Sequence, residues 1–130
     1  MLLFGHPFID FKPFYHIDEI DEIERTPANS ALFTHFSENN LDIIKHMQTN
    51  CLTFALEVTN LSEAVFAHNL GASYIVVRPE LASHAQALAE NYLFDAKILC
   101  RLENGDNLEE TIIQGIDGVI YAQAIIKTSN

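Results

Sequence analysis

The stretch Thr53–Val77, TFALEVTNLSEAVFAHNLGASYIVV, predicts a strand, a helix and a second strand. Phe54, Leu56 and Val58 alternate with smaller or polar residues in the first strand. Tyr74–Val77 is an unbroken apolar run, which is typical of a strand that is buried on both faces of a parallel sheet. Strand, crossover helix and strand within so short a span favour a right-handed βαβ unit.

The helix between these two strands has signals at both of its ends. Its apolar residues recur at helical spacing: Leu61, Ala64, Val65 and Leu70. Asn60 is a favourable N-cap, and the carboxylate of Glu63 is placed to reach back to the N–H of the cap. Gly71 suits the left-handed residue that commonly follows a helix.

The same unit repeats along the chain. Strand centres are expected about 22 residues apart, near Phe33, Ala55, Ile75, Leu99 and Val119. We therefore predict an α/β fold with a mainly parallel sheet of about five strands and alternating helices. The repeat leaves two architectures open, a three-layer flavodoxin-like sheet and an open half-barrel. A full eight-fold barrel takes about 200 residues or more, so we do not expect this chain to close one alone.

We expect a single α/β domain over residues 1–130. Residues 1–29 are predicted to be an irregular aromatic segment plus a short helix at Asp18–Arg25, with Asp18 as its cap. Residues 30–122 carry the repeated βα units, and Ser37 or Asn40 is expected to cap the helix after the first of these strands.

The two ends of the chain give weaker patterns. Pro7 and Pro13 cannot donate to a β ladder, so we expect short extended pieces over an edge or end of the sheet and no central strand in the aromatic segment. The apolar tail at Ala124–Ile126 suits either an edge strand or a helical turn.

Composition excludes several classes of partner and site. The net charge is −11, from seven basic and eighteen acidic residues, which disfavours nucleic acid and anionic membrane surfaces. The apolar N-terminus lacks the basic region of a signal peptide, and no apolar run is long enough to span a membrane. Two cysteines without an export signal suggest free thiols in the cytoplasm.

Two resemblances accompany these patterns. The segments EAVFAHNLGASYIVV, NYLFDAKILC and GIDGVIYA resemble parts of small, uncharacterised bacterial α/β proteins, which implies the fold and no activity. Leu56-Glu57-Val58-Thr59, followed by an alanine-containing helix, resembles the LEVT stretch of 2-keto-3-deoxy-6-phosphogluconate aldolases, which are (β/α) barrel enzymes. This second resemblance implies a catalytic acid–base role for Glu57.

Ligands of parallel α/β folds bind beyond the carboxyl ends of the strands. At these ends we expect Glu57 and His35 as acid–base candidates and Arg78, Arg101, Thr59 and Asn60 as ligand-binding candidates. The two arginines would grip a carboxylate or phosphate, and helix N-termini would add N–H donors. The ordinary alternative is a set of rim ion pairs, Arg78 with Glu57 or Glu80 and Arg101 with Glu103.

Metals and cofactors find little support in the sequence. Six histidines are scattered without metal-ligand spacing, so we expect no metal site. The five glycines are dispersed and form no phosphate-binding loop, and we expect no cofactor. Cys100 is predicted to be a small core residue, whereas Cys51 would be reactive if it is exposed.

Two functions from different classes remain. We favour a non-catalytic protein that acts through self-association, such as a homodimer, or through a protein partner, using the aromatic N-terminus or the apolar tail. The alternative is binding of a small anionic metabolite, phosphorylated or carboxylate, at the carboxyl ends of the strands, in a lyase or isomerase. Convergence of Arg78 and Arg101 on one concavity with Glu57 would support the alternative.

Overall fold

The computed structural model describes residues 1–128 and contains one sheet of eight strands. The strands are β1 (Leu2–Phe4), β2 (Phe14–His16), β3 (Ala31–His35), β4 (Phe54–Glu57), β5 (Tyr74–Val77), β6 (Lys97–Leu102), β7 (Gly118–Tyr121) and β8 (Ile125–Lys127). Their order is β1-β7-β6-β5-β4-β3-β2-β8, and neighbouring strands pair in parallel throughout. The predicted α/β fold with a parallel sheet is confirmed.

The prediction of about five strands is wrong. The three additional strands, β1, β2 and β8, are only three residues long and lie in the aromatic segment and the apolar tail. Strands this short offer too few positions for an alternating pattern, and no α-helix separates β1 from β2 or β7 from β8. The repeat of strand and helix therefore did not indicate them.

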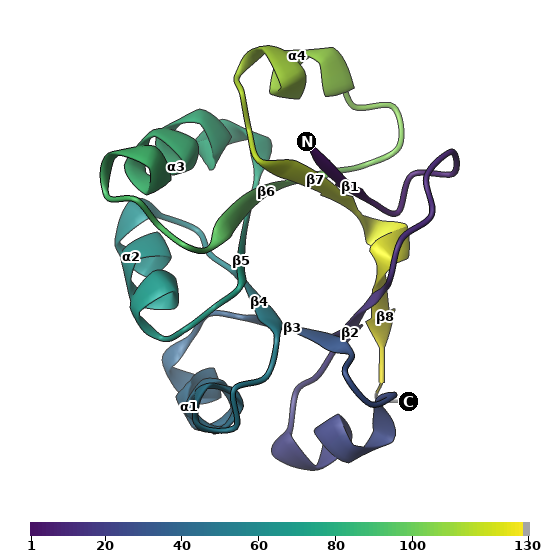
Figure 1. Cartoon of the computed structure of the whole chain (residues 1–130), viewed down its shortest axis with the longest axis vertical. Helices are drawn as coiled ribbons and strands as arrows, with labels where there is room; N and C mark the ends of the chain where they lie inside the picture. Colours follow the sequence, from purple (N-terminus) through teal and green to yellow (C-terminus); the bar gives the residue numbers. More distant parts are fainter. Residues whose placement is uncertain (129–130) are drawn as a thin grey trace.

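Helical segments connect most of the strands of the curved sheet. They are η1 (Ile20–Arg25), η2 (Glu38–Asn40), α1 (Leu41–Thr49), α2 (Leu61–Asn69), α3 (Pro79–Asn91), α4 (Leu108–Ile113) and η3 (Ala122–Ala124). Figure 1 shows the strands arranged around a ring, with α1 to α4 on its outer side. Within residues 1–128 the edge strands β1 and β8 do not pair with each other. The sheet is therefore an open half-barrel rather than a flat three-layer sheet.

Curvature gives the molecule two apolar cores. The inner core fills the ring and consists of Phe14, Phe33, Ala55, Val76, Leu99, Ile120 and Ala124, with Phe4, Ala31, Tyr74 and Ile125 packed against it. The outer core lies between the sheet and the helices and includes Leu56 and Ile75, which alternate with inner-core residues along their strands. The centre of the ring is thus packed with side chains, as in larger (β/α) barrels.

The unit β4–α2–β5 has the predicted order, although the Glu63 carboxylate bonds the N–H of Thr59 and not that of the cap Asn60. The two strands are parallel, and Asn60 caps α2 by accepting a hydrogen bond from the Glu63 N–H at 2.8 Å. Gly71 follows α2 with a φ of +87°, a left-handed conformation that favours glycine. In contrast, neither Ser37 nor Asn40 caps α1 through its side chain, since a short 3-10 turn, η2, leads directly into that helix.

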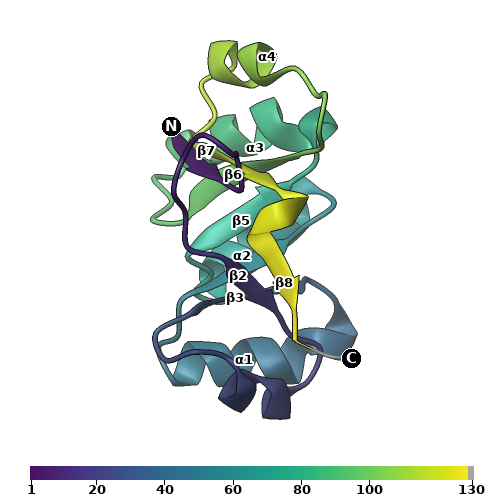
Figure 2. The same cartoon turned by 90° about the vertical axis from the view of Figure 1, so that its right-hand side faces the viewer.

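The N-terminal segment forms part of the sheet itself. Strand β2 lies between β3 and β8, so the expectation that this segment has no central strand is wrong. Pro7 and Pro13 lie just outside the strands, where no ladder N–H is needed. Figure 2 shows β8 beside β2. The predicted helix at Asp18–Arg25 is shorter, being the 3-10 helix η1, and Glu19 rather than Asp18 precedes it.

Strand β1 depends on a glycine in its neighbour. A Cβ atom at Gly118 would stand 2.8 Å from the Cβ of Leu2 and 2.7 Å from Cδ2 of Leu99. Since real Cβ atoms do not approach so closely, only glycine permits β1 to pair here.

None of the helices in residues 1–128 has the length and apolar character that a membrane crossing requires.

Candidate functional site

The carboxyl ends of five strands carry polar residues at equivalent positions. Each of these residues follows an inner-core residue of its strand by two positions: His16 follows Phe14, His35 follows Phe33, Glu57 follows Ala55, Arg78 follows Val76 and Arg101 follows Leu99. Because side chains alternate between the faces of a sheet, a spacing of two directs them to the inner side of the ring. We call these five residues the mouth cluster.

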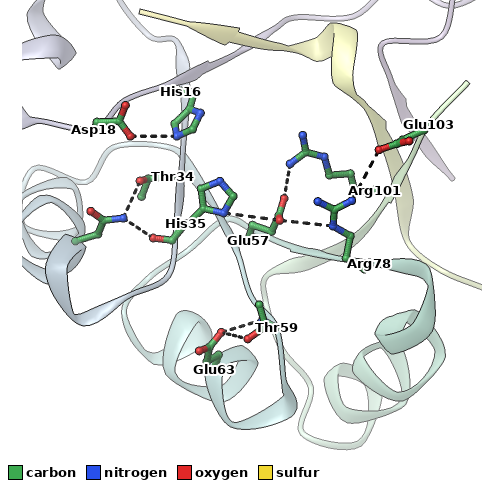
Figure 3. A network of polar contacts seen from close by, with 11 residues as sticks. His16, Asp18, Thr34, His35, Glu57, Thr59, Glu63, Arg78, Arg101 and Glu103 are labelled. Carbon is green, nitrogen blue, oxygen red and sulfur yellow. Dashed lines mark hydrogen bonds and ion pairs between the residues drawn. The ribbon is translucent and has the colours of Figure 1, made fainter. Parts of the chain in front are cut away.

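Glu57 is the centre of the mouth cluster (Figure 3). One carboxylate oxygen, Oε1, accepts a hydrogen bond from Nη1 of Arg101 at 2.6 Å. The other, Oε2, lies 3.8 Å from Nε of Arg78 and 3.7 Å from Nδ1 of His35. Glu57 is only 7% exposed, so its charge depends on these partners for stabilisation.

The two arginines have different environments. The side chain of Arg101 is 22% exposed and holds the close contact with Glu57. The side chain of Arg78 is 51% exposed, and its contacts with Glu57 and with the exposed Glu103 are 3.8 and 4.0 Å long. Arg101 is therefore held in place, whereas Arg78 has loose partners that a ligand could replace.

The predicted rim ion pairs are present in part. Arg78 pairs with Glu57, as that alternative states. Arg101 pairs with Glu57 and not with Glu103, which contacts Arg78 instead. The two arginines thus converge on one carboxylate at the inner side of the ring.

Thr59 and Asn60 form the start of α2 and are engaged there. The Glu63 carboxylate accepts hydrogen bonds from the Thr59 N–H at 2.8 Å and from its hydroxyl at 3.0 Å, while the Asn60 side chain caps the helix. These internal bonds occupy donors that the sequence had suggested for a ligand. Thr59 and Arg78 line the same small pocket of about 230 Å³, and its lining includes neither Glu57 nor Arg101, so the expected single concavity for all three is not seen there.

Asn40 contributes to the mouth cluster indirectly. Its amide donates to the carbonyl oxygen of His35 at 2.8 Å and to Oγ1 of Thr34 at 3.3 Å. These bonds fix the end of β3, from which the His35 side chain projects toward Glu57 (Figure 3).

His16 was not among the site residues expected from the sequence. It lies on β2, with its ring 5.4 Å from the ring of His35 and 5.1 Å from that of Phe33. The repeated pattern Phe-x-His, at Phe14-Tyr15-His16 and again at Phe33-Thr34-His35, is the signal that could have identified it. It was missed because β2 was not predicted to be a strand of the sheet.

His16 is buried. Burial lowers the pKa of this imidazole below its ordinary value of 6.5, and the nearby cation Lys127 and the His35 ring act in the same direction. Asp18 and Glu22 oppose the shift. In the folded protein His16 therefore resists protonation near neutral pH.

The cysteines and the other histidines stay outside the mouth cluster. Both cysteines are free; Cys51 is exposed, and burial raises the pKa of Cys100 to about 11. His68 stacks on Phe94 with ring centroids 4.1 Å apart. Across residues 1–128, no group of three His, Cys, Asp or Glu side chains is arranged to hold a metal ion.

A groove lies at the opposite end of the barrel. It has a volume of about 840 Å³ and is lined at the start of the strands, where Phe4, Phe14 and Tyr74 pack edge to face. Its charged side chains are Asp10 and Lys12. The paired acidic, basic and imidazole groups that acid–base chemistry requires lie instead at the mouth cluster.

Comparisons with known proteins add no family to this description. The chain matches no protein-family model and no curated protein sequence. The chemistry of the mouth cluster therefore has to be argued from its own geometry. It offers two guanidinium groups for a small anion, and a carboxylate and two imidazoles for proton transfer.

Proposed function

We propose that this protein binds a small anionic metabolite, a phosphate ester or a carboxylate, at the mouth cluster. The observation that carries the proposal is the convergence of Arg78 and Arg101 on Glu57 at the carboxyl ends of parallel strands. Ligand sites of α/β barrels lie at this end because the loops that follow the strands surround it. Two of the seven basic residues of a chain with net charge −11 meet there.

Arg78 is the group that we assign to the ligand. Its guanidinium is half exposed, and its ion pairs are loose, so that it can turn to a phosphate or carboxylate at small cost. Arg101 has the separate task of holding Glu57 in place. Glu57 and Glu103 balance the two guanidinium charges in the free protein, so an anion binds Arg78 by displacing the exposed Glu103.

Proton transfer to or from the bound molecule is the reaction type that fits. Glu57 and His35 face each other at 3.7 Å, and either is a suitable general acid or base. This supports a lyase or isomerase acting on an anionic substrate. The resemblance of Leu56–Thr59 to the LEVT stretch of 2-keto-3-deoxy-6-phosphogluconate aldolases points to the same role for Glu57.

Thermal unfolding with a panel of phosphate monoesters and dicarboxylates tests the proposal. A ligand at a hundred times its Kd stabilises the native state by about 2.7 kcal/mol, which raises the Tm of a domain of this size by roughly 5–10 °C. R78M removes a charged donor, so it should need about tenfold or more ligand to reach the same rise in Tm. The matched control is R25M, which removes the same charge at an exposed position on η1.

Two results would contradict the proposal. The first is a wild-type Tm that no member of the panel raises. The second is an equal loss of response in R78M and R25M, because that outcome would reflect net charge and not a site.

Self-association is the second candidate, and the exposed part of the aromatic segment favours it. Phe8 is 88% exposed, Ile9 46% and Phe11 37%, although Phe14 of the same segment is buried. Contiguous apolar residues at a surface mark interaction sites more often than scattered ones. On this proposal the protein is a cytoplasmic homodimer held together by Phe8–Phe11.

Light scattering over a concentration series tests the second candidate. The wild-type mass should rise toward that of a dimer, and F8S should shift the chain toward the monomer. L93S is the control, since Leu93 is 84% exposed but lies just after α3, outside the aromatic segment. A wild-type chain that stays monomeric at high concentration would remove this candidate.

A further inference from the structure

We propose that His16 is a further residue of the anion site, and that binding of a doubly charged anion at the mouth cluster is coupled to the uptake of a proton by His16. The inference rests on the proposed function and adds to it both a ligand class and a pH dependence. The class is a doubly charged tetrahedral anion, such as sulfate or a phosphate monoester.

The position of His16 supports its membership of the site. It lies on β2, next to β3 in the sheet, and its ring is 5.4 Å from the ring of His35, which in turn faces Glu57. Figure 3 shows His16, His35 and Glu57 following one another across the mouth. An anion held between Arg78 and His35 would lie on the His35 side that His16 approaches.

One ring nitrogen of His16 is buried without a hydrogen-bond partner. Nε2 is buried and makes no hydrogen bond within residues 1–128, although Oδ1 of Asp18 lies 3.4 Å away. A buried polar atom in this state is costly. Protonation would place a positive charge beside the Asp18 carboxylate and convert the contact into an ion pair.

The charges around His16 explain why a ligand would be needed for this protonation. Asp18 and Glu22 favour the imidazolium, whereas Lys127 on β8 and His35 on β3 oppose it. Asp18 is shared, because its other oxygen lies 3.5 Å from Nζ of Lys127. Burial is the largest effect and keeps His16 neutral in the free protein near pH 7.

A doubly charged ligand changes this balance. Glu57 and Glu103 already balance the charges of Arg78 and Arg101, so a dianion brings negative charge that no fixed cation at the mouth compensates. A negative charge nearby favours the imidazolium, and His16 is the buried neutral group in position to take the proton. By linkage, the dianion must then bind more tightly as the pH falls.

Isothermal titration of the wild-type protein with sulfate measures the coupling directly. Sulfate keeps its double charge across the range used, so any proton that is taken up goes to the protein. Titrations near neutral pH in two buffers of different ionisation enthalpy should show an uptake approaching one proton per sulfate. The sulfate affinity should rise roughly tenfold or more between about pH 8 and about pH 5.5, the interval in which imidazoles titrate.

The variant H16Q tests the residue. At about pH 8 it should bind sulfate with the wild-type affinity. Between about pH 8 and about pH 5.5 its sulfate affinity should rise less than about threefold. H84Q is the matched control, since His84 is an exposed histidine on α3, and it should keep the wild-type pH dependence. The wild-type titration requires no variant, so poor folding of H16Q would not remove the test.

Three outcomes would overturn the inference, and they differ in what they leave standing. Sulfate binding without proton uptake leaves the proposed anion site intact and removes the coupling. A pH dependence that persists in H16Q but disappears in H35Q removes the role of His16. Absence of binding by sulfate and by the whole ligand panel at every pH removes the proposed function and this inference together.

Discussion

The carboxylate of Glu57 on β4 and the guanidinium of Arg101 on β6 are joined across the intervening strand β5, with 2.6 Å between Oε1 and Nη1. The two residues are 44 positions apart in the sequence. Two residues that belong to non-adjacent strands meet because the sheet curves and brings its inner side chains toward a common axis. This contact organises the mouth cluster, since the other carboxylate oxygen is thereby left to Arg78 and His35.

The two arginines should differ in their effect on stability. R101M leaves the buried Glu57 carboxylate without its closest partner and should lower the free energy of unfolding by about 2–3 kcal/mol. R78M breaks only long, exposed contacts and should cost at most about 1 kcal/mol. Urea unfolding at about pH 7 measures both values. Equal costs for the two variants would show that Glu57 does not depend on Arg101.

Acid should destabilise the protein through His16. Its folded-state pKa is lowered below 6.5, mainly by burial, so the unfolded chain binds the proton more readily than the native state does. The free energy of unfolding should therefore be unaffected by His16 above about pH 6.5 and should fall as the pH drops below it.

The comparison of H16Q with H84Q isolates this contribution. When the pH falls from about 7.5 to about 5.5, the Tm of H16Q should decrease less than that of the wild type, because H16Q lacks the buried group that resists protonation. H84Q removes an exposed histidine and should follow the wild type. If H16Q lost as much Tm as the other two proteins, the acid sensitivity would come from groups other than His16.

The two thiols should differ in reactivity. At about pH 8 a disulfide reagent should modify the exposed Cys51, while Cys100, with a pKa of about 11, is thiolate in only about one molecule in a thousand and is also buried. One thiol per chain should react in the native state, and both should react in denaturant. C51N is the informative variant, because asparagine tolerates the positive φ of +54° at this position.

For C51N the native protein should show no fast-reacting thiol. Two rapidly reacting thiols in the native wild type would mean that β6 opens readily around Cys100, in conflict with its place in the outer core.

Much of the fold could be predicted from local pattern. The β4–α2–β5 unit carries its own information, since Asn60 and Glu63 specify where α2 begins and the apolar run at Tyr74–Val77 specifies a buried strand. The short strands β1, β2 and β8 could not be predicted in this way. They exist because the curved sheet offers them free edges and because Gly118 lets Leu2 approach.

The amino-acid sequence by itself determined which side chains stand at the carboxyl ends of the strands, because alternation along a strand decides the face on which Glu57, Arg78 and Arg101 lie. Only the tertiary structure decided which of them meet. The distance across strands depends on the curvature of the sheet, and this curvature carried Arg101 over β5 to Glu57 and brought His16 on β2 beside His35. The alternation of residues along one strand does not reveal this curvature, because the curvature arises from the packing of all the strands around the inner core.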